Sequence, residues 1–391
     1  MDTLQKQTRE QAAYVSALRQ ELHRHPELSL QEYRTAQVIE RELDRAGIAH
    51  SRIGATGVLG ILKGEKPGGR VIALRADIDA LPIQEQNTSD HRSREAGRMH
   101  ACGHDAHIAI LLGAAQVLAQ RRDTFGGEVR FLFQPAEEIG RGAEDFLAAG
   151  ALDGVGRVFG MLVAPDLPAG TVGLKPGLNN AAVDGFRIVV QGKSAHVSAP
   201  EQGIDALYIA SHIVVALQAQ VARRTSPVEP VILGIGTFHS GTTYNALAET
   251  AELEGTTRTV SAASRAKARE QVNETAAGIA ALYGGTAEVI WDDITSALIN
   301  DPAASGEVKE LVRTYRPELT AVTDRALALS GDNFAEFLLK TPGVYAYLGT
   351  SDPDRPETQN PIHSSRFELD EAALEIGVWL HAAYAEWWLK S

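Results

Sequence analysis

The sequence predicts an α/β protein with two domains. Two separate segments of the chain build a larger domain around a mixed sheet, and a smaller α+β domain is inserted between them. The chain has 391 residues, enough for more than one hydrophobic core. Its first part alternates short apolar runs with helical patterns, which is typical of a sheet covered by helices. Its middle part follows the order strand, helix, strand, strand, helix, strand, as in a ferredoxin-like unit.

The first segment of the larger domain, residues 1–182, is expected to begin with helices. Apolar residues recur at helical spacing from about residue 8 to residue 47, with a break at His25-Pro26. Strand-length apolar runs bounded by glycine or charged residues follow, together with one strongly apolar helix. We expect strands at residues 57–62, 71–76, 127–133 and 158–163, and the helix at residues 106–118.

The inserted domain is expected at residues 183–293. Its first strand alternates apolar and polar residues, which indicates a sheet with one face exposed to water. The pattern of the larger domain returns over residues 294–391 and ends in a helix at residues 371–389. Within the inserted domain we expect strands at residues 185–191, 231–238, 251–259 and 287–291, and helices at residues 205–223 and 262–283.

The composition narrows the classes of partner. Lys and Arg total 37 and Asp and Glu total 50, so the net charge is −13. This surplus argues against a nucleic-acid partner, which needs a basic face, and against binding to anionic membranes. No apolar run approaches the roughly 18 residues of a spanning helix, and the polar start lacks the apolar stretch of a secretory signal. The single cysteine, Cys102, excludes an intrachain disulfide, and we expect a cytoplasmic protein.

Two short stretches carry candidate metal chemistry. Cys102 and His104 lie in the sequence Met-His-Ala-Cys-Gly-His-Asp, at the start of a helix, and a thiolate and an imidazole at this spacing can reach one metal ion from a tight turn. Glu137 and Glu138 follow a predicted strand at its carboxyl end, where open α/β sheets bind ligands. One carboxylate can ligate a metal while its neighbour acts as a general base. Taken alone, each stretch also has an ordinary explanation, a chance pair or a solvated acidic loop.

Two further stretches are weaker signals by themselves. His363 precedes the last helix and could be a ligand, although a lone histidine there is more often a surface loop residue. Asp77 and Asp79 follow the strand at residues 71–76. They could orient metal ligands through hydrogen bonds, or simply cap the following turn.

Together these stretches resemble the M20 metallopeptidase family, and in particular its amidohydrolase branch with hippurate hydrolases and aminoacylases. The resemblance covers nearly the whole chain. It extends from the Leu-His-Arg-His-Pro-Glu-Leu-Ser string at residues 22–29, through the Cys/His and Pro-Ala-Glu-Glu strings, to the Phe-Glu-Leu-Asp string at residues 367–370. The resemblance implies up to two divalent ions per chain, of Zn, Mn, Co or Ni.

The resemblance also implies the ligands. Cys102 would bridge two ions, Glu138 and His363 would complete one site, and His104 would belong to the other. The chain departs from the family at Leu162, where a histidine ligand is expected. An isobutyl side chain cannot ligate, so the second site would keep only two protein ligands. The chain could therefore work with one firmly held metal, be an inactive binding relative, or be an engineered variant.

The remaining roles are likewise implied by the resemblance. Glu137 would be the base and Asp77 would support the catalytic centre. The inserted domain would be the family's lid, which often forms a homodimer. On it, His196 would meet the substrate carbonyl, and Asn245 and Arg258 would meet its carboxylate, which suits the guanidinium fork of arginine.

The expected activity is hydrolysis of the amide bond of small N-acyl or N-aroyl amino acids. Metal-activated water would attack the acyl carbon and Glu137 would take its proton. Two alternatives stay open: a weakened or inactive binding relative, because of Leu162, and a dipeptidase or carboxypeptidase.

Overall fold

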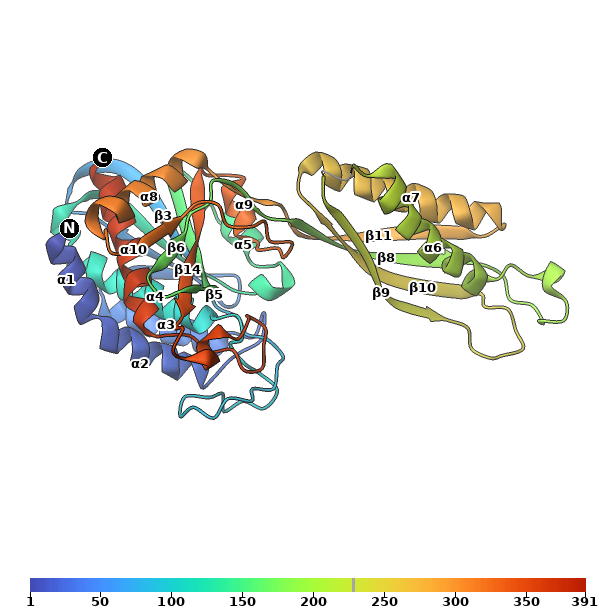
Figure 1. Cartoon of the computed structure of the whole chain (residues 1–391), viewed down its shortest axis with the longest axis horizontal. Helices are drawn as coiled ribbons and strands as arrows, with labels where there is room; N and C mark the ends of the chain where they lie inside the picture. Colours follow the sequence, from blue (N-terminus) through green and yellow to red (C-terminus); the bar gives the residue numbers. More distant parts are fainter. Residues whose placement is uncertain (227–228) are drawn as a thin grey trace. The chain divides into compact units, whose positions relative to one another are not determined.

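The computed structural model describes residues 1–226 and 229–391 and divides the chain into two compact units (Figure 1). Unit 1 comprises residues 1–179, 299–326 and 333–391, and unit 2 comprises residues 180–298 and 327–332. The expected fold class, a mixed α/β domain with an inserted α+β domain, is confirmed.

Unit 1 is built on an eight-stranded mixed sheet. In spatial order its strands are β1 (Ala49–Ile53), β2 (Gly57–Lys63), β4 (Gly126–Gln134), β3 (Lys66–Asp77), β5 (Arg157–Pro168), β14 (Gly343–Ser351), β6 (Thr171–Gly173) and β13 (Thr320–Val322). The central strands β4, β3, β5 and β14 run parallel to one another, and the pairs β1/β2, β2/β4 and β14/β6 are antiparallel. A separate two-stranded sheet pairs β7 (Gly177–Asn180) with β12 (Leu298–Asn300).

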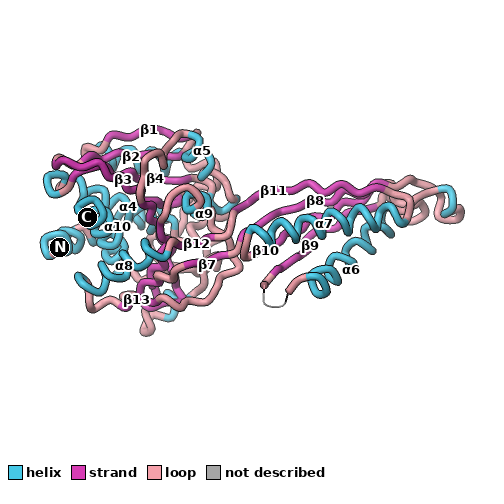
Figure 2. Tube along the Cα trace, turned by 90° about the horizontal axis from the view of Figure 1, so that it is seen from above, coloured by secondary structure: helices cyan, strands magenta, loops and turns pink. Residues whose placement is uncertain are grey.

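Helices cover both faces of this sheet. Figure 2 shows α4 and α10 on one side of it and α5 and α9 on the other. The α-helices of unit 1 are α1 (Asp2–Glu10), α2 (Ala12–His23), α3 (Tyr33–Arg45), α4 (His104–Ala119), α5 (Ala143–Ala148), α8 (Pro302–Tyr315), α9 (Phe334–Leu338) and α10 (Ala372–Lys390). Its short 3₁₀ turns are η1 (Arg122–Thr124), η2 (Glu137–Ile139) and η4 (Pro356–Gln359).

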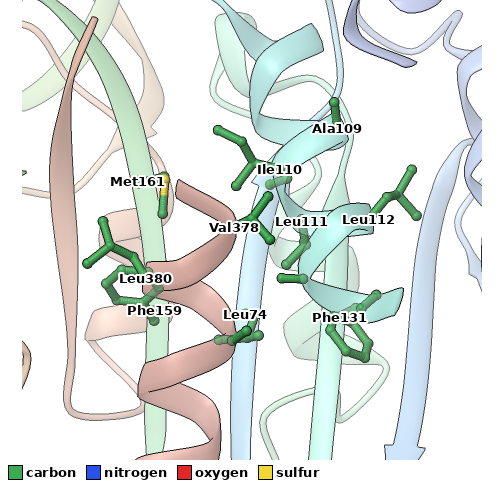
Figure 3. Close-up of a cluster of buried hydrophobic side chains, with 14 of the residues drawn as sticks. Leu74, Ala109, Ile110, Leu111, Leu112, Phe131, Phe159, Met161, Val378 and Leu380 are labelled. Atoms are coloured by element: carbon green, nitrogen blue, oxygen red, sulfur yellow. The ribbon is translucent and has the colours of Figure 1, made fainter. Parts of the chain in front are cut away.

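The core of unit 1 lies between the sheet and the helix pair α4 and α10. Nearly every residue of α4 is buried, because α2 and α10 pack against it as well as the sheet. Figure 3 shows this core, in which side chains of three neighbouring strands meet those of α4 and α10: Leu74, Phe131, Phe159, Met161, Ile110, Leu111, Val378 and Leu380. This packing holds the first residue of α4, His104, at a fixed place against the sheet.

Unit 2 has the ferredoxin-like arrangement expected from the order of its elements. Its antiparallel sheet is ordered β11 (Thr286–Thr295), β8 (Ala182–Gln191), β10 (Thr250–Thr259) and β9 (Val231–Ser240). Helices α6 (Ala206–Arg224) and α7 (Ala262–Leu282) pack on one face, and a 3₁₀ turn, η3, covers Pro200–Gln202 (Figure 1). The helix starts are capped by Asp205 and Ser261, whose side chains accept N–H groups of the first turn.

The two units differ from the domain ranges expected from the sequence at both boundaries, where residues 180–182 and 294–298 belong to unit 2, and in one further segment. Residues 327–332 belong to unit 2, although they fall within the range 294–391 expected for the larger domain. Backbone hydrogen bonding explains this, since the N–H of Ala181 donates to the carbonyl of Ala328 at 3.0 Å, and Thr295 Oγ1 donates to the carbonyl of Asp332 at 3.1 Å. Such long-range pairing leaves no local pattern in the sequence.

None of the helices formed by the described residues combines the length and the apolar character that crossing a bilayer requires.

Candidate metal centre

The centre forms where the parallel strands β3 and β4 end side by side. Asp77, the last residue of β3, is paired in register with Gln134, the last residue of β4. Ligand-binding groups gather at the carboxyl edge of an open α/β sheet, because the chain leaves the sheet there in loops. The loop after β4 carries Glu137 and Glu138 in the turn η2. The predicted acidic residues therefore enter the site from adjacent strands.

A buried carboxylate fixes the two glutamates. Asp79 accepts the N–H of Glu137 on Oδ1 at 3.1 Å and the N–H of Glu138 on Oδ2 at 3.1 Å. The turn before them places Ala136 in a left-handed conformation, with φ 57°, and its N–H donates to Glu32 Oε1 at 3.0 Å. Hydrogen bonds to a charged acceptor are strong, so both peptide groups are held firmly.

The second ligand-bearing segment is the start of α4. Gly103 has φ 82°, and a Cβ at this position would lie 2.3 Å from Val163 Cγ2 of β5, so glycine is required here for two reasons. The ring of His104 donates from Nδ1 to the carbonyl oxygen of Asp79 at 2.9 Å. This bond orients the imidazole and leaves Nε2 as the nitrogen that can bind a metal.

Four predicted ligands converge in unit 1. Ligand atoms of Cys102, His104 and Glu138 all lie within 4.8 Å of one another. Glu138 Oε1 lies 3.8 Å from His104 Nε2, and Glu138 Oε2 lies 3.4 Å from His363 Nε2. Two donors bound at about 2.1 Å to one tetrahedral ion are about 3.4 Å apart, so this spacing suits a shared ion. Glu138 Oε1 is buried and accepts no hydrogen bond, and a cation would satisfy it.

The electrostatics of these groups also suit a cation. Burial raises the pKa of the Cys102 thiol, and the charge of Glu138 raises it further. Burial lowers the pKa of His104, but Asp77 and Cys102 outweigh this effect and hold it well above its ordinary value. Both shifts reflect negative charge that is crowded around buried groups. A divalent ion relieves that crowding and favours the thiolate and the neutral imidazole, which are the ligating forms.

His363 reaches the centre from a strained loop. It has φ 65°, unusual for a residue with a Cβ, and its N–H donates to the carbonyl of Ala101 at 2.7 Å. The loop is also fastened by Asn87 Nδ2, which donates to the carbonyl of Phe367 at 2.8 Å. The side chain of His363 is 49% exposed, so the centre opens to solvent on this side.

Asp77 is fully buried and hydrogen-bonded on both oxygens. Its Oδ1 lies 2.5 Å from His107 Nδ1, and its Oδ2 lies 2.5 Å from Arg75 Nη1. Burial raises its pKa, but Arg75 and His104 outweigh this and hold the pKa well below the ordinary range. Asp77 therefore stays ionised behind the ligand residues.

The side chain of Glu137, the proposed base, is held by Asn333, the residue directly before α9. The backbone N–H of Asn333 donates to Glu137 Oε1 at 3.4 Å. The Asn333 side chain is itself fixed, because its Oδ1 accepts from Arg75 at 3.1 Å and from Gln134 at 2.8 Å. No local motif signals this arrangement, since it joins residues almost 200 positions apart.

A buried charge cluster beneath α4 is a second feature without a sequence signal. We name Arg19, His23, Glu85 and Asp105 the Asp105 cluster. Asp105 Oδ2 accepts from Arg19 Nε at 2.8 Å and lies 2.8 Å from His23 Nδ1, while His23 Nε2 lies 3.3 Å from Glu85. Burial lowers the pKa of His23, but Asp105 outweighs it and the pKa is raised to about 9. The cluster anchors the first turn of α4, directly after His104, to α2.

Three predicted substrate-binding residues lie in unit 2. His196 and Asn245 are neighbours there, since the N–H of Val197 donates to the carbonyl of Asn245 at 3.1 Å. Both side chains are near the surface, and the ring of His196 is bonded to Ser198. Arg258 lies half-buried on β10, and its guanidinium makes no hydrogen bond or ion pair with any group that the structure describes; burial lowers its pKa.

Leu162, the residue that departs from the family pattern, lies on β5 opposite Tyr347 of β14. Its neighbour Val163 touches Gly103 and donates its N–H to His107 Nε2 at 3.0 Å. This stretch of β5 therefore runs directly beside the start of α4.

Comparisons with known proteins agree with this geometry. Residues 73–387 match the model of peptidase family M20/M25/M40. The chain is 37% identical over 98% of both chains to thermostable carboxypeptidase 1 of Saccharolobus solfataricus, and 40% identical over 92% of both chains to an N-acetylcysteine deacetylase of Bacillus subtilis. A solved structure from Bacillus subtilis, described as a dinuclear metal-binding peptidase of the M20 family, is similar with a TM-score of 0.83 and 38% identity, over 98% of this chain and 99% of the other.

The family match covers most of the chain, and the two relatives align with nearly all of it. The resemblance inferred from the Cys/His and Glu-Glu strings is thereby confirmed. The chain is a hydrolase that belongs to peptidase family M20/M25/M40.

Proposed function

We propose that this protein hydrolyses the amide bond of small N-acyl amino acids at a divalent metal centre held by Cys102, His104, Glu138 and His363. The observation that carries the proposal is the buried, unbonded Oε1 of Glu138 facing His104 Nε2, directly beside Glu137 in the chain. Soft thiolate, imidazole and carboxylate donors together suit Zn, and also Mn, Co or Ni. A bound ion would polarise the acyl carbonyl and make water more acidic.

The residues of the chain then have separate tasks. Glu137 takes a proton from water on its carboxylate and returns it to the leaving amine. Asp79 fixes the peptide group of Glu137, and the N–H of Asn333 orients its Oε1. Asp77 keeps its charge behind the ligands through Arg75. Holding the base before the substrate arrives removes the cost of ordering it in the transition state.

Unit 2 supplies the recognition of the substrate. Arg258 has no charged partner among the described residues, and an unpaired, half-buried guanidinium suits the carboxylate that every N-acyl amino acid carries. His196 is proposed to stabilise the negative charge that develops on the acyl oxygen. Asn245, its neighbour, would add a neutral hydrogen bond to the carboxylate.

Carboxypeptidase-like cleavage is the second candidate, because a relative 37% identical over 98% of this chain carries that name. Its substrate also ends in a free carboxylate on the amine side of the scissile bond. Arg258 suits both substrates equally. The two functions differ only in the acyl side, so N-acetyl, N-benzoyl and N-terminally blocked dipeptide substrates must be compared at equal concentration.

The experiment loads the purified chain with Zn²⁺, Mn²⁺, Co²⁺ or Ni²⁺ and measures amino acid release from these substrates. We expect Glu137→Gln to lower kcat at least about 100-fold, since it removes the general base, with metal content and melting temperature unchanged. Glu144→Gln changes an exposed acid nearby and serves as the matched control. If no metal form released an amino acid, the chain would be an inactive binding relative. If Glu137→Gln kept full activity, the role of Glu137 would be wrong.

A homodimer through unit 2 stays a prediction. Strand β9 ends the sheet order of unit 2 and carries exposed apolar side chains at Ile232 and Phe238. An edge of this kind can pair with a second copy. Light scattering of the chain in solution tests it, and a monomer at all concentrations would contradict it.

A further inference from the structure

Among the residues that the structure describes, two groups of three potential ligands converge, and they share His104. One is Cys102, His104 and Glu138, and the other is Asp77, His104 and His107. The similar Bacillus subtilis structure is described as dinuclear. Whether this chain can also hold two ions depends on whether the second group has donor atoms to spare.

Hydrogen bonding removes His107 from the possible ligands. Its Nε2 lies 3.0 Å from the backbone N–H of Val163, which can only donate. Nε2 must therefore be the unprotonated nitrogen, and the proton of the neutral ring is on Nδ1. That proton is directed at Asp77 Oδ1, 2.5 Å away. Both ring nitrogens of His107 are thus engaged.

Both oxygens of Asp77 are engaged as well. Its Oδ1 accepts from His107 and its Oδ2 accepts from Arg75 Nη1 at 2.5 Å. An ion placed between these residues would have to share these oxygens with two buried hydrogen bonds and lie beside the positive charge of Arg75. The second group is therefore a hydrogen-bonded network that supports His104, and only the first group has the orphaned acceptor that an ion requires.

Strand β5 offers no replacement ligand. The side chain of Val163 packs against Gly103, between Cys102 and His104, so this strand runs directly beside the start of α4. Leu162, the residue before Val163 on this strand, has no lone pair to offer. The family resemblance places a histidine ligand at this position, and with leucine the ion bound there would keep only Cys102 and His104.

We propose that the centre of this chain holds one divalent ion, bound by Cys102, His104, Glu138 and His363, and that Leu162 is the reason why a second ion is not retained. The inference rests on the proposed function, because it assigns the same four ligands. It goes further in stating that the thiolate of Cys102 serves one ion rather than bridging two. Catalysis would then depend on a single ion and on Glu137.

The test is the metal content of the full-length protein after loading with Mn²⁺ and removal of free ions, measured by elemental analysis. Electron paramagnetic resonance on the same samples distinguishes an isolated Mn²⁺ from a spin-coupled pair. We expect one ion per chain and an isolated-ion spectrum in the natural sequence. Leu162→His should raise the content towards two and add the coupled signal, whereas Leu162→Val, which adds no donor, should stay at one.

Each other outcome contradicts a distinct statement. Two coupled ions in the natural sequence would overturn the one-ion centre while leaving a metal-dependent hydrolase intact. No retained ion would overturn both this inference and the proposed function. One ion in Leu162→His, with an unchanged melting temperature showing that it is folded, would mean that Leu162 is not the cause. A Glu138→Gln variant that kept its ion at full affinity would show that the ion lies elsewhere.

Discussion

Unit 1 and unit 2 hold their candidate functional residues in opposite ways. In unit 1, Asp77 and His104 are almost completely buried, and each is tied to several partners. In unit 2, His196 and Asn245 lie near the surface and Arg258 has no charged partner among the described residues. The difference agrees with the proposed function, in which the groups of unit 1 are ordered before the substrate arrives and those of unit 2 gain partners when it binds.

This contrast predicts that substitutions in unit 1 affect metal affinity and stability together, and the largest effect is expected at Asp79. In Asp79→Asn, an amide N–H₂ replaces the oxygen that accepts from Ser29 Oγ at 2.7 Å and from the N–H of Glu138, so donors would face donors. We expect a loss of roughly 3 kcal/mol in the free energy of unfolding and a 10- to 100-fold weaker metal affinity, on the order seen for residues that orient ligands.

Denaturant unfolding and metal titration of Asp79→Asn measure the two effects. Asp153→Asn, at an exposed loop position, is the control and should change the free energy of unfolding by less than about 0.5 kcal/mol. Unchanged metal affinity in Asp79→Asn would show that the turn η2, which carries Glu137 and Glu138, does not need this carboxylate.

The Asp105 cluster predicts a pH-dependent part of the stability of unit 1. The pKa of His23 is about 9 in the folded chain, above its ordinary value of 6.5. A histidine whose pKa is higher in the folded chain than in the unfolded chain stabilises the fold. The stabilisation is complete at a pH below the unfolded pKa, and it is lost as the pH rises through the folded pKa. His23→Gln should therefore lower the free energy of unfolding by roughly 3 kcal/mol more at pH 6 than at pH 10.

Chemical denaturation of the metal-free natural chain and of His23→Gln, at several pH values, measures this difference. Using metal-free protein removes the pH dependence of metal binding from the comparison. A difference that stays constant from pH 6 to pH 10 would mean that His23 is not charged in the folded chain.

A substitution in unit 2 should have the smallest effect of the three, and it should change substrate binding without changing stability. Arg258→Met keeps an unbranched, flexible side chain but removes the charge that is proposed to meet the substrate carboxylate. We expect KM to rise about 10-fold or more, because the variant loses the binding free energy of a charge-assisted hydrogen bond. The melting temperature should stay close to that of the natural chain. Arg187→Met on the neighbouring strand β8 is the control and should leave KM unchanged. A normal KM in Arg258→Met would remove Arg258 from the substrate site.

The sequence predicted the features that have local patterns. The strand and helix order of unit 2 predicted a ferredoxin-like topology, and the Cys-Gly-His and Glu-Glu strings predicted ligands that the structure brings together. Those strings are informative because each places a donor at the end of a strand or the start of a helix, where side chains converge.

The features that the sequence did not reveal depend on contacts between distant residues. The sequence marked Asp79 only as one of two acids after a strand. Its hydrogen bond with the N–H of Glu137 depends on the register of β3 and β4. The bond from Asn333 to Glu137 and the pairing of Arg19 with Asp105 likewise join remote parts of the chain. Spacing along the sequence carries no information about such geometry.

The most direct test of the metal centre is X-ray absorption spectroscopy of the zinc-loaded natural chain. If Cys102, His104, Glu138 and His363 bind the ion, the spectrum will show one sulfur at about 2.3 Å, nitrogen or oxygen neighbours at about 2.0–2.2 Å, and no second metal nearby. A zinc coordination shell without sulfur would contradict this centre, because Cys102 is the sole cysteine of the chain.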